Sequence, residues 1–427
     1  MDAKELPARP NLEYYKNLAK DLLRAYTSED SASLQRIGEH FNQPLTWDRL
    51  REAAQRRLRK LKGSASPSAR FGLADGQFLI ARSYGFESWP KFKKHIEAAL
   101  RKNSPVSKFE LAADAVIAGD IATLARFLYE TPELIRARST RAHQSTLLHY
   151  VSANGVEDFR QKTPSNAVEV AKILLQAGAE VDAENNPGHG TTLGLVATSF
   201  HPAQAGVQIA LLETLLQAGA SPDGLPGGWN PLTAALANGR GDAAAFLAQR
   251  GARLDLEGAA GVGRLDVVKS FFNEDGTLRS NATQEQMKSG FAWACEYGRT
   301  GVVDFFLQQG INVGTRLRHD GETALHWAAY NAHVDSVKLL LQRGAPVNAK
   351  DESYEGTPLG WALYAWSGPP PEAKRDHYYE VVALLVAAGA TVDTAWLDDP
   401  RRESPITEKL RVDPRMLAAI RQHPKSI

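Results

Sequence analysis

Three tryptophans that recur at equal intervals are the residues in this chain best suited to bind another molecule. Trp293, Trp327 and Trp361 are 34 residues apart, and Tyr330 and Tyr364 follow the last two by three residues. Residues three apart on a helix share a face, and aromatic side chains supply the rigid contact area that is enriched in binding hot spots. The same tryptophans could instead only fill space between adjacent helices. We predict a partner-binding stripe made of Trp293, Tyr297, Trp327, Tyr330, Trp361 and Tyr364.

The sequence offers little for catalysis. It contains no phosphate-cradling G-x-x-x-x-G-K-S/T loop, no H-E-x-x-H zinc motif and no pair of cysteines. Cys295 is the only cysteine, so an intrachain disulfide and a multi-cysteine metal site are excluded. We therefore expect no cofactor, no metal and no catalytic activity, although an enzymatic role stays open. One alternative is a metal or acid–base site formed by His143, His189 and His201 with Asp182 or Glu184.

The composition is that of an ordinary folded protein. The chain has 427 residues, of which 43% are hydrophobic and 23% charged. No run approaches the ~18 apolar residues that a membrane span needs, and the first residues have no apolar signal-peptide core. We therefore expect a cytoplasmic protein without a membrane span.

Charge is distributed unevenly along the chain. Residues 1–103 hold 20 Lys and Arg against 12 Asp and Glu, and the remainder holds 30 against 37. Neither part has the charge density of a dedicated nucleic-acid binder. The segment 49–62 is strongly basic, and this pattern is typical of a solvated helix face. A site for phosphate, nucleic acid or an acidic partner is the alternative there.

The segment Gly321–Lys350 predicts the helical unit that would position the aromatic stripe. A short helix begins after Thr323, and apolar residues from Val334 to Leu341 give a second helix one apolar face. Gly344 then ends this helix, because glycine enters the left-handed region without a steric penalty.

Similar units recur from about residue 108 to residue 397. Gly-Ala pairs begin at positions 178, 219, 251, 344 and 389, and the interval is near 33 where no insertion intervenes. The sequences Thr-Ala-Leu-His at 323–326, Gly-Ala at 344–345 and Val-Asn-Ala at 347–349 closely resemble the ankyrin repeat. This resemblance implies an all-α ankyrin-repeat solenoid of about eight repeats, whose stacked neighbours bury apolar faces that one unit cannot bury alone. It also implies that the array binds another protein through its concave face and finger loops, and that His149 and His326 hydrogen-bond neighbouring turns.

Two segments flank the predicted array of residues 108–397. Residues 1–103 are expected to form a small helical domain, with helices near 11–26, 31–41 and 46–61 and a flexible break at Gly63–Ser68. Its segment LADGQFLIARSYGFESWPKFKKHIE resembles a helical module found ahead of ankyrin arrays in many bacterial proteins. That resemblance implies a bacterial origin and a capping or interaction role. Residues 398–427 are expected to supply a closing helix.

Insertions and small residues mark two further candidate sites. The insertions Val156–Asn166, Phe200–Gly206 and Ser367–His377 are either contact edges or tolerated surface loops. Where later units carry tryptophan, the middle units carry Ala234 and Gly258, which predicts a hollow able to admit a side chain or a small molecule. An enzyme or small-molecule binder using this hollow is therefore the alternative to protein recognition. Its lining would be Tyr150, Leu195, Ala234, Glu257 and Gly258.

Overall fold

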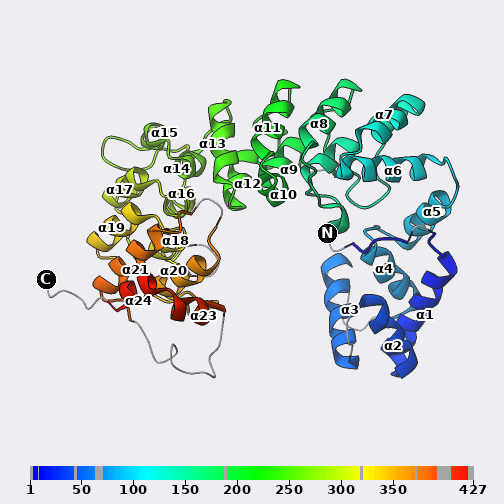
Figure 1. Cartoon of the computed structure of the whole chain (residues 1–427), viewed down its shortest axis with the longest axis horizontal. Helices are drawn as coiled ribbons and strands as arrows, with labels where there is room; N and C mark the ends of the chain where they lie inside the picture. The colour runs from blue at the N-terminus through cyan, green and yellow to red at the C-terminus, as the bar shows by residue number, and fades with distance from the viewer. Residues whose placement is uncertain are drawn as a thin grey trace. The chain divides into compact units, whose positions relative to one another are not determined.

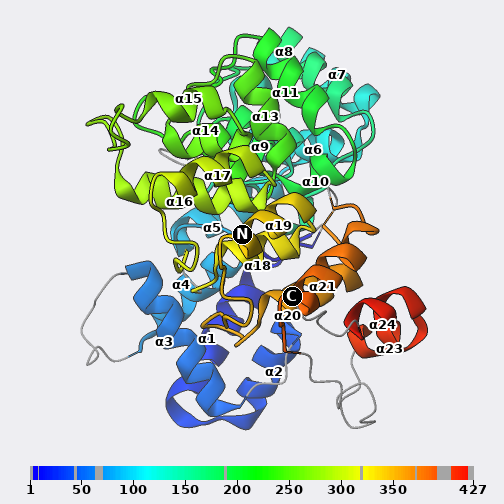
Figure 2. The same cartoon turned by 90° about the vertical axis from the view of Figure 1, so that its left-hand side faces the viewer.

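The computed structural model describes residues 3–7, 9–42, 46–62, 71–186, 190–317, 321–370, 373–391 and 405–421. These residues form helices joined by turns, with two isolated β-bridges and no strand, which confirms the all-α prediction. The chain divides into two compact units, Met1–Ala243 and Ala244–Ile427 (Figures 1 and 2). In the described part, no helix is long and apolar enough to cross a membrane.

The first unit begins with five helices around an aromatic core. They are α1 (Leu12–Ser28), α2 (Ser31–Phe41), α3 (Trp47–Lys62), α4 (Leu73–Ser83) and α5 (Trp89–Ala99). Local sequence sets the helix starts: Asn11, Asp30 and Ser88 cap α1, α2 and α5 by accepting backbone N–H groups. Tyr15 and Phe92 are buried with their ring centroids 5.1 Å apart. The predicted break at Gly63–Ser68 lies outside the described residues.

Helical hairpins follow in the first unit. Their elements are α6 (Pro105–Ala118), α7 (Ile121–Glu130), η1 (Pro132–Arg136), η2 (Leu147–Ser152), η3 (Asp158–Arg160), α8 (Ala167–Gln176), α9 (Thr192–Thr198), α10 (Phe200–Gln204), α11 (Gln208–Gln217) and α12 (Pro231–Ala237). Helix α13 (Gly241–Gln249) begins in the first unit and ends in the second. The first helices pack in the order α6, η2, α9 and α12. The domain boundaries expected at residues 103 and 108 stay predictions, since the N-terminal helices and these hairpins share one compact unit.

The second unit repeats the hairpin in a regular stack. Its elements are α14 (Leu256–Val262), α15 (Leu265–Ser270), α16 (Gln284–Glu296), α17 (Thr300–Gln308), α18 (Ala324–Tyr330), α19 (Val334–Gln342), α20 (Pro358–Ser367), α21 (His377–Ala387), α23 (Pro405–Val412) and α24 (Pro414–Ile420). The first helices α14, α16, α18 and α20 pack in one row, and α15, α17, α19 and α21 in a second (Figure 1). The described residues 405–421 of the expected closing segment form two helices: α23 packs on α20 and α24 on α21, burying Leu410 and Met416.

One glycine position ends the second helix of most hairpins. The backbone φ is positive at this position, between 78° and 94°. A Cβ placed there would meet nothing within 4 Å, so space does not explain the glycine. The left-handed backbone conformation explains the glycine, as the Gly-Ala spacing predicted. The residues are Gly178, Gly219, Gly251, Gly310, Gly344 and Gly389.

The motif histidines join turns to helices. His326 Nδ1 accepts from the Thr323 backbone N–H at 3.0 Å, so Nε2 carries the proton and donates to the Gly356 carbonyl at 3.1 Å. In the first unit, His149 Nδ1 likewise accepts from the Thr146 N–H at 3.1 Å. Burial lowers the pKa of His149 to about 3 and lowers that of His326. Both histidines are therefore neutral structural groups at pH 7.

A cluster of buried charges lies between the first two hairpins. The side chains of Arg141, Glu157 and Arg160 are 2%, 1% and 4% exposed. Glu110 Oε2 lies 3.2 Å from Arg141 Nη2 and 2.7 Å from Arg160 Nη1. Glu157 Oε1 contacts Arg141 Nε, and Arg160 Nη2 lies 2.8 Å from Asp114 Oδ1. Arg141 thus faces two carboxylates, and Arg160 faces three, since Glu157 Oε1 also lies 3.3 Å from its Nη1.

This cluster also joins the N-terminal helices to the array. Arg141 Nη1 donates to the Tyr84 carbonyl at 2.9 Å, and its guanidinium lies 5.1 Å from the centroid of the Phe86 ring. Glu157 and Arg160 both belong to the insertion Val156–Asn166. This insertion is therefore partly buried and is not only a surface loop.

Replacing Glu157 by glutamine should destabilise the protein strongly. Burial alone would raise the pKa of Glu157, but the hydrogen bond from His143 and the charges of Arg141 and Arg160 outweigh it and lower that pKa. Without this carboxylate the buried arginines lose a counter-charge, and breaking such a pair costs about 3–5 kcal/mol. We expect Glu157→Gln to lower the free energy of unfolding in urea by that amount. The control is Asp158→Asn at the exposed neighbouring residue, and equal stability of the two variants would contradict the prediction.

Stability should also fall between pH 7 and pH 5. Burial lowers the pKa of His40 and His95 to about 4 and that of His149 to about 3. The unfolded chain, with histidine pKa values of about 6.5, then binds more protons than the folded chain, so stability is present above pH 6.5 and is lost as pH falls. The buried His95 and His149 should each contribute roughly 2 kcal/mol of destabilisation at pH 5, and the partly exposed His40 should contribute less. Urea unfolding at both pH values tests this, and His149→Gln should flatten the dependence; a stability independent of pH would refute it.

Candidate functional site

Three aromatic rings meet on the first-helix row of the second unit. Trp327 and Tyr330 lie on α18, and Trp361 lies on the adjacent helix α20. The Trp361 ring centroid is 5.3 Å from that of Trp327 and 5.8 Å from that of Tyr330, with interplanar angles of 85° and 74°. These are the edge-to-face contacts that aromatic rings prefer. The repeat therefore brings together residues that are 34 positions apart.

Both tryptophans are held by carboxylates of the turns that precede their helices. Trp327 Nε1 donates to Glu322 Oε1 at 3.1 Å, and Trp361 Nε1 donates to Asp351 Oδ2 at 3.0 Å. Asp351 also accepts the backbone N–H groups of the turn, from Ser353, Tyr354 and Gly356. Burial would raise the pKa of Asp351, but these hydrogen bonds, led by that from Trp361, lower it. The indoles are therefore fixed in orientation.

Tyr364 is the most exposed member of the predicted stripe. Its side chain lies one turn beyond Trp361 on α20 and is 63% exposed. Tyr330 is partly buried, and burial, Tyr364 and Glu296 together raise its pKa. The phenol of Tyr364 therefore acts electrostatically on the phenol of Tyr330.

The two predicted residues at the C-terminal part of α16, Trp293 and Tyr297, differ from the other four residues of the predicted stripe. Trp293 is 7% exposed and so offers a partner little surface. Tyr297, at the C-terminal cap of α16, is partly buried. We define the aromatic face as Trp327, Tyr330, Trp361 and Tyr364. Partner binding by any of these residues stays a prediction.

The residues predicted to line a hollow lie in both units. In the first unit, Tyr150 is fully buried with its hydroxyl 3.5 Å from Glu157 Oε1, and Leu195 is 5% exposed, so neither offers a ligand surface. Ala234 on α12 is partly exposed. In the second unit, Gly258 is buried and Glu257 is partly exposed on α14. Ligand binding at these positions remains a prediction.

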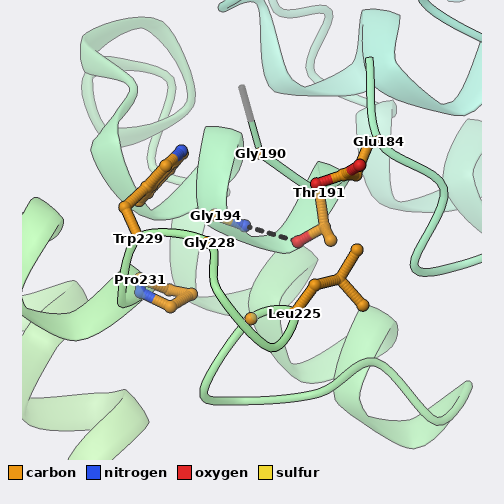
Figure 3. Close-up of a pocket in the computed structure, with 9 residues that line it drawn as sticks. Glu184, Gly190, Thr191, Gly194, Leu225, Gly228, Trp229 and Pro231 are labelled. Carbon is orange, nitrogen blue, oxygen red and sulfur yellow. Dashed lines mark hydrogen bonds between the residues drawn. The ribbon is translucent and has the colours of Figure 1, made fainter. Parts of the chain in front are cut away.

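Trp229, which sequence reasoning did not single out, covers the start of helix α9 in the first unit. A Cβ on Gly194 would lie 2.8 Å from its ring atom Cη2, and one on Gly190 would lie 2.3 Å from Cζ2. Beside the indole is a cavity of about 10 Å³, which has room for about one water molecule (Figure 3). The sequence feature that could have indicated this contact is Gly194, because other units carry the histidine of the Thr-x-Leu-His motif at this position. The cavity is lined by Glu184, Gly190, Thr191, Gly194, Gly224, Leu225, Gly228, Trp229 and Pro231.

The histidines proposed as a metal or acid–base site are differently placed. His143 is 1% exposed with Nε2 3.5 Å from Glu157 Oε1, whereas His201 lies on α10. Asp182 accepts the Ser221 backbone N–H at 3.1 Å, and His189 lies outside the described residues. Within the described ranges, no group of three or more His, Cys, Asp or Glu could hold a metal ion.

The basic segment 49–62 forms most of α3. Two of its arginines are paired: Arg51 lies 2.9 Å from Glu29 and Arg56 lies 2.6 Å from Glu52. The side chains from residue 57 to residue 62 lie outside the described part. The described arginines therefore contribute to a solvated, partly neutralised face.

Comparison with known proteins identifies the repeats. The family model for ankyrin repeats, in three copies, matches residues 256–351 and 291–396, which include α14 to α21. Residues 256–396 are therefore ankyrin repeats, and such repeats are generally protein–protein interaction modules. The human ASB11 ankyrin repeat domain is 20% identical and is covered over 99% of its length, against 65% of this chain, with a TM-score of 0.29. That score is too low to support a structural argument, and no curated protein matches this sequence.

Two glycines at the same repeat position should respond oppositely to alanine. Gly194→Ala would push a methyl group into the Trp229 ring, and such overpacking costs about 1–3 kcal/mol. Gly360→Ala is the matched control, because its Cβ would meet only Thr357 Oγ1, at 3.6 Å. We expect the control to be neutral, or more stable by up to about 1 kcal/mol through helix propensity. Urea unfolding and tryptophan emission measure both variants; similar effects would show that Trp229 does not lie against Gly194.

Proposed function

We propose that this protein recognises another protein, without catalysis, through the aromatic face and the finger turns of its second unit. The observation that carries this proposal is the contact of Trp327, Tyr330 and Trp361 beside the exposed Tyr364. Aromatic residues near the centre of an interface contribute a large share of binding energy. Ankyrin repeats are generally interaction modules, which supports the same reading. Bacterial origin and cytoplasmic location remain predictions from the sequence.

The aromatic face is organised before a partner arrives. Its tryptophans bond to Glu322 and Asp351, and Asp351 in turn shapes the following finger turn. A binding surface whose side chains are already ordered loses little conformational entropy on association. Tyr364 has the largest exposed area of the four rings and therefore the most apolar surface to bury.

Replacing Tyr364 by alanine should weaken partner binding without unfolding the protein. The side chain is exposed, so its removal leaves no cavity, whereas loss of a tyrosine hot spot costs about 2 kcal/mol or more. We expect at least about a 30-fold loss of affinity for a partner captured from the native host and measured by calorimetry. The control is Tyr129→Ala, which removes a tyrosine that is 88% exposed on α7. If both variants bind the partner equally well, the aromatic face is not the binding site.

A further inference from the structure

We propose that the partner presents a basic segment, and that a lysine or arginine side chain of this segment lies on the aromatic face. This inference rests on the proposed function and adds the chemical class of the partner. Its basis is the charge of the surroundings together with the electronic character of the rings.

The charges around the aromatic face are mainly acidic. Helices α18 and α20 carry no Asp, Glu, Lys or Arg. The turn that joins α19 to α20, residues 343–357, bears Asp351, Glu352 and Glu355 on its last seven positions. Glu296 on α16 is close enough to raise the pKa of Tyr330. A cation approaching these rings would therefore be attracted, whereas an acidic segment would be repelled.

Three cations near the face, among the residues that the structure describes, are engaged within the chain. Arg316 Nη1 donates to the Gly321 and Lys350 carbonyls, and Lys350 Nζ lies 3.3 Å from Glu355 Oε2. At the other end of α20, Lys409 donates to the Ser367 carbonyl. The acidic character of the turn is therefore only partly compensated.

The rings are suited to a cation. The face of an aromatic ring is negative, and tryptophan binds cations better than tyrosine or phenylalanine does. Each indole N–H here donates to a carboxylate, and this polarises the ring toward greater electron density. Because Trp361 stands nearly perpendicular to Trp327 and Tyr330, the ring faces point in different directions. An ammonium or guanidinium group could then meet a ring face and a carboxylate together.

Fluorescence anisotropy with two labelled twelve-residue peptides tests this inference on the full chain. One peptide alternates Lys and Arg with Gly and Ser, and the other has glutamine at every basic position. We expect the basic peptide to bind at least about ten times more tightly, and more weakly as salt increases. Tetramethylammonium chloride should compete better than sodium chloride at equal ionic strength, because it binds ring faces. Equal binding of the two peptides would overturn the inference.

Variants localise the binding. Tyr364→Ala should weaken the basic peptide about two- to fivefold, as expected for an exposed cation–π contact. Glu352→Gln should weaken it by a similar factor, whereas Asp335→Asn, at an exposed carboxylate on α19 in the second helix row, should not. If Glu352→Gln and Asp335→Asn have equal effects, the peptide binds by net charge alone and the inference fails.

The effect of Tyr364→Ala on the affinity for the captured partner distinguishes a failure of this inference from a failure of the proposed function. If Tyr364→Ala weakens a captured partner whose contact segment is neutral or acidic, the proposed function stands and the basic-segment inference falls. If Tyr364→Ala leaves that partner's affinity unchanged, the proposed function itself falls.

Discussion

The structure depends on the stacking of helical hairpins that are too small to fold alone. Helix α18 has seven residues, and isolated helices of that length are not stable in water. Its Leu325, Ala328 and Ala329 are fully buried because neighbouring hairpins cover them. The glycine that ends the second helix of most hairpins makes this possible, since it lets the chain turn in the same way after each of them. The position of each ring on the aromatic face therefore follows from the repeat as a whole.

Aromatic side chains cover the first helices differently in the two units. In the second unit, rings carried by the first helices meet one another, and the turn carboxylates of Glu322 and Asp351 hold their indoles. In the first unit, Trp229 comes from a turn and covers Gly194 on α9. An aromatic ring on the helix can remain partly available to a partner, whereas a ring folded down from the turn occupies that surface itself. This difference favours the second unit as the recognition surface.

Local and periodic features could be predicted from the sequence, whereas contacts that depend on insertions could not. Apolar spacing predicted α1, α2 and α19, and the 34-residue interval predicted that Trp327 and Trp361 would lie on neighbouring helices. The pairing of Glu110 with Arg160 had no such signal, because it joins residues 50 positions apart across an aperiodic insertion. The burial of Tyr150 follows from that same insertion, whose Glu157 lies against its hydroxyl. The contact of Trp229 could not be predicted, because the turns between hairpins do not recur at a fixed spacing. The sequence therefore gives no register that would place its indole.

The buried ion pairs of the first unit are better explained by the arrangement of chain segments that they fix than by a gain in the free energy of folding. Moving two ions out of water costs several kcal/mol each, and apolar residues of similar volume are often as stable. An apolar contact, however, tolerates sliding, whereas Arg141 must reach Glu110, Glu157 and the Tyr84 carbonyl at once. Only one placement of the N-terminal helices on the first hairpins satisfies all three. The carboxylates hold Arg141 in place among the hairpins, and the N-terminal helices must then present the Tyr84 carbonyl to its remaining N–H group. Any other placement of these helices would leave that buried donor without its partner.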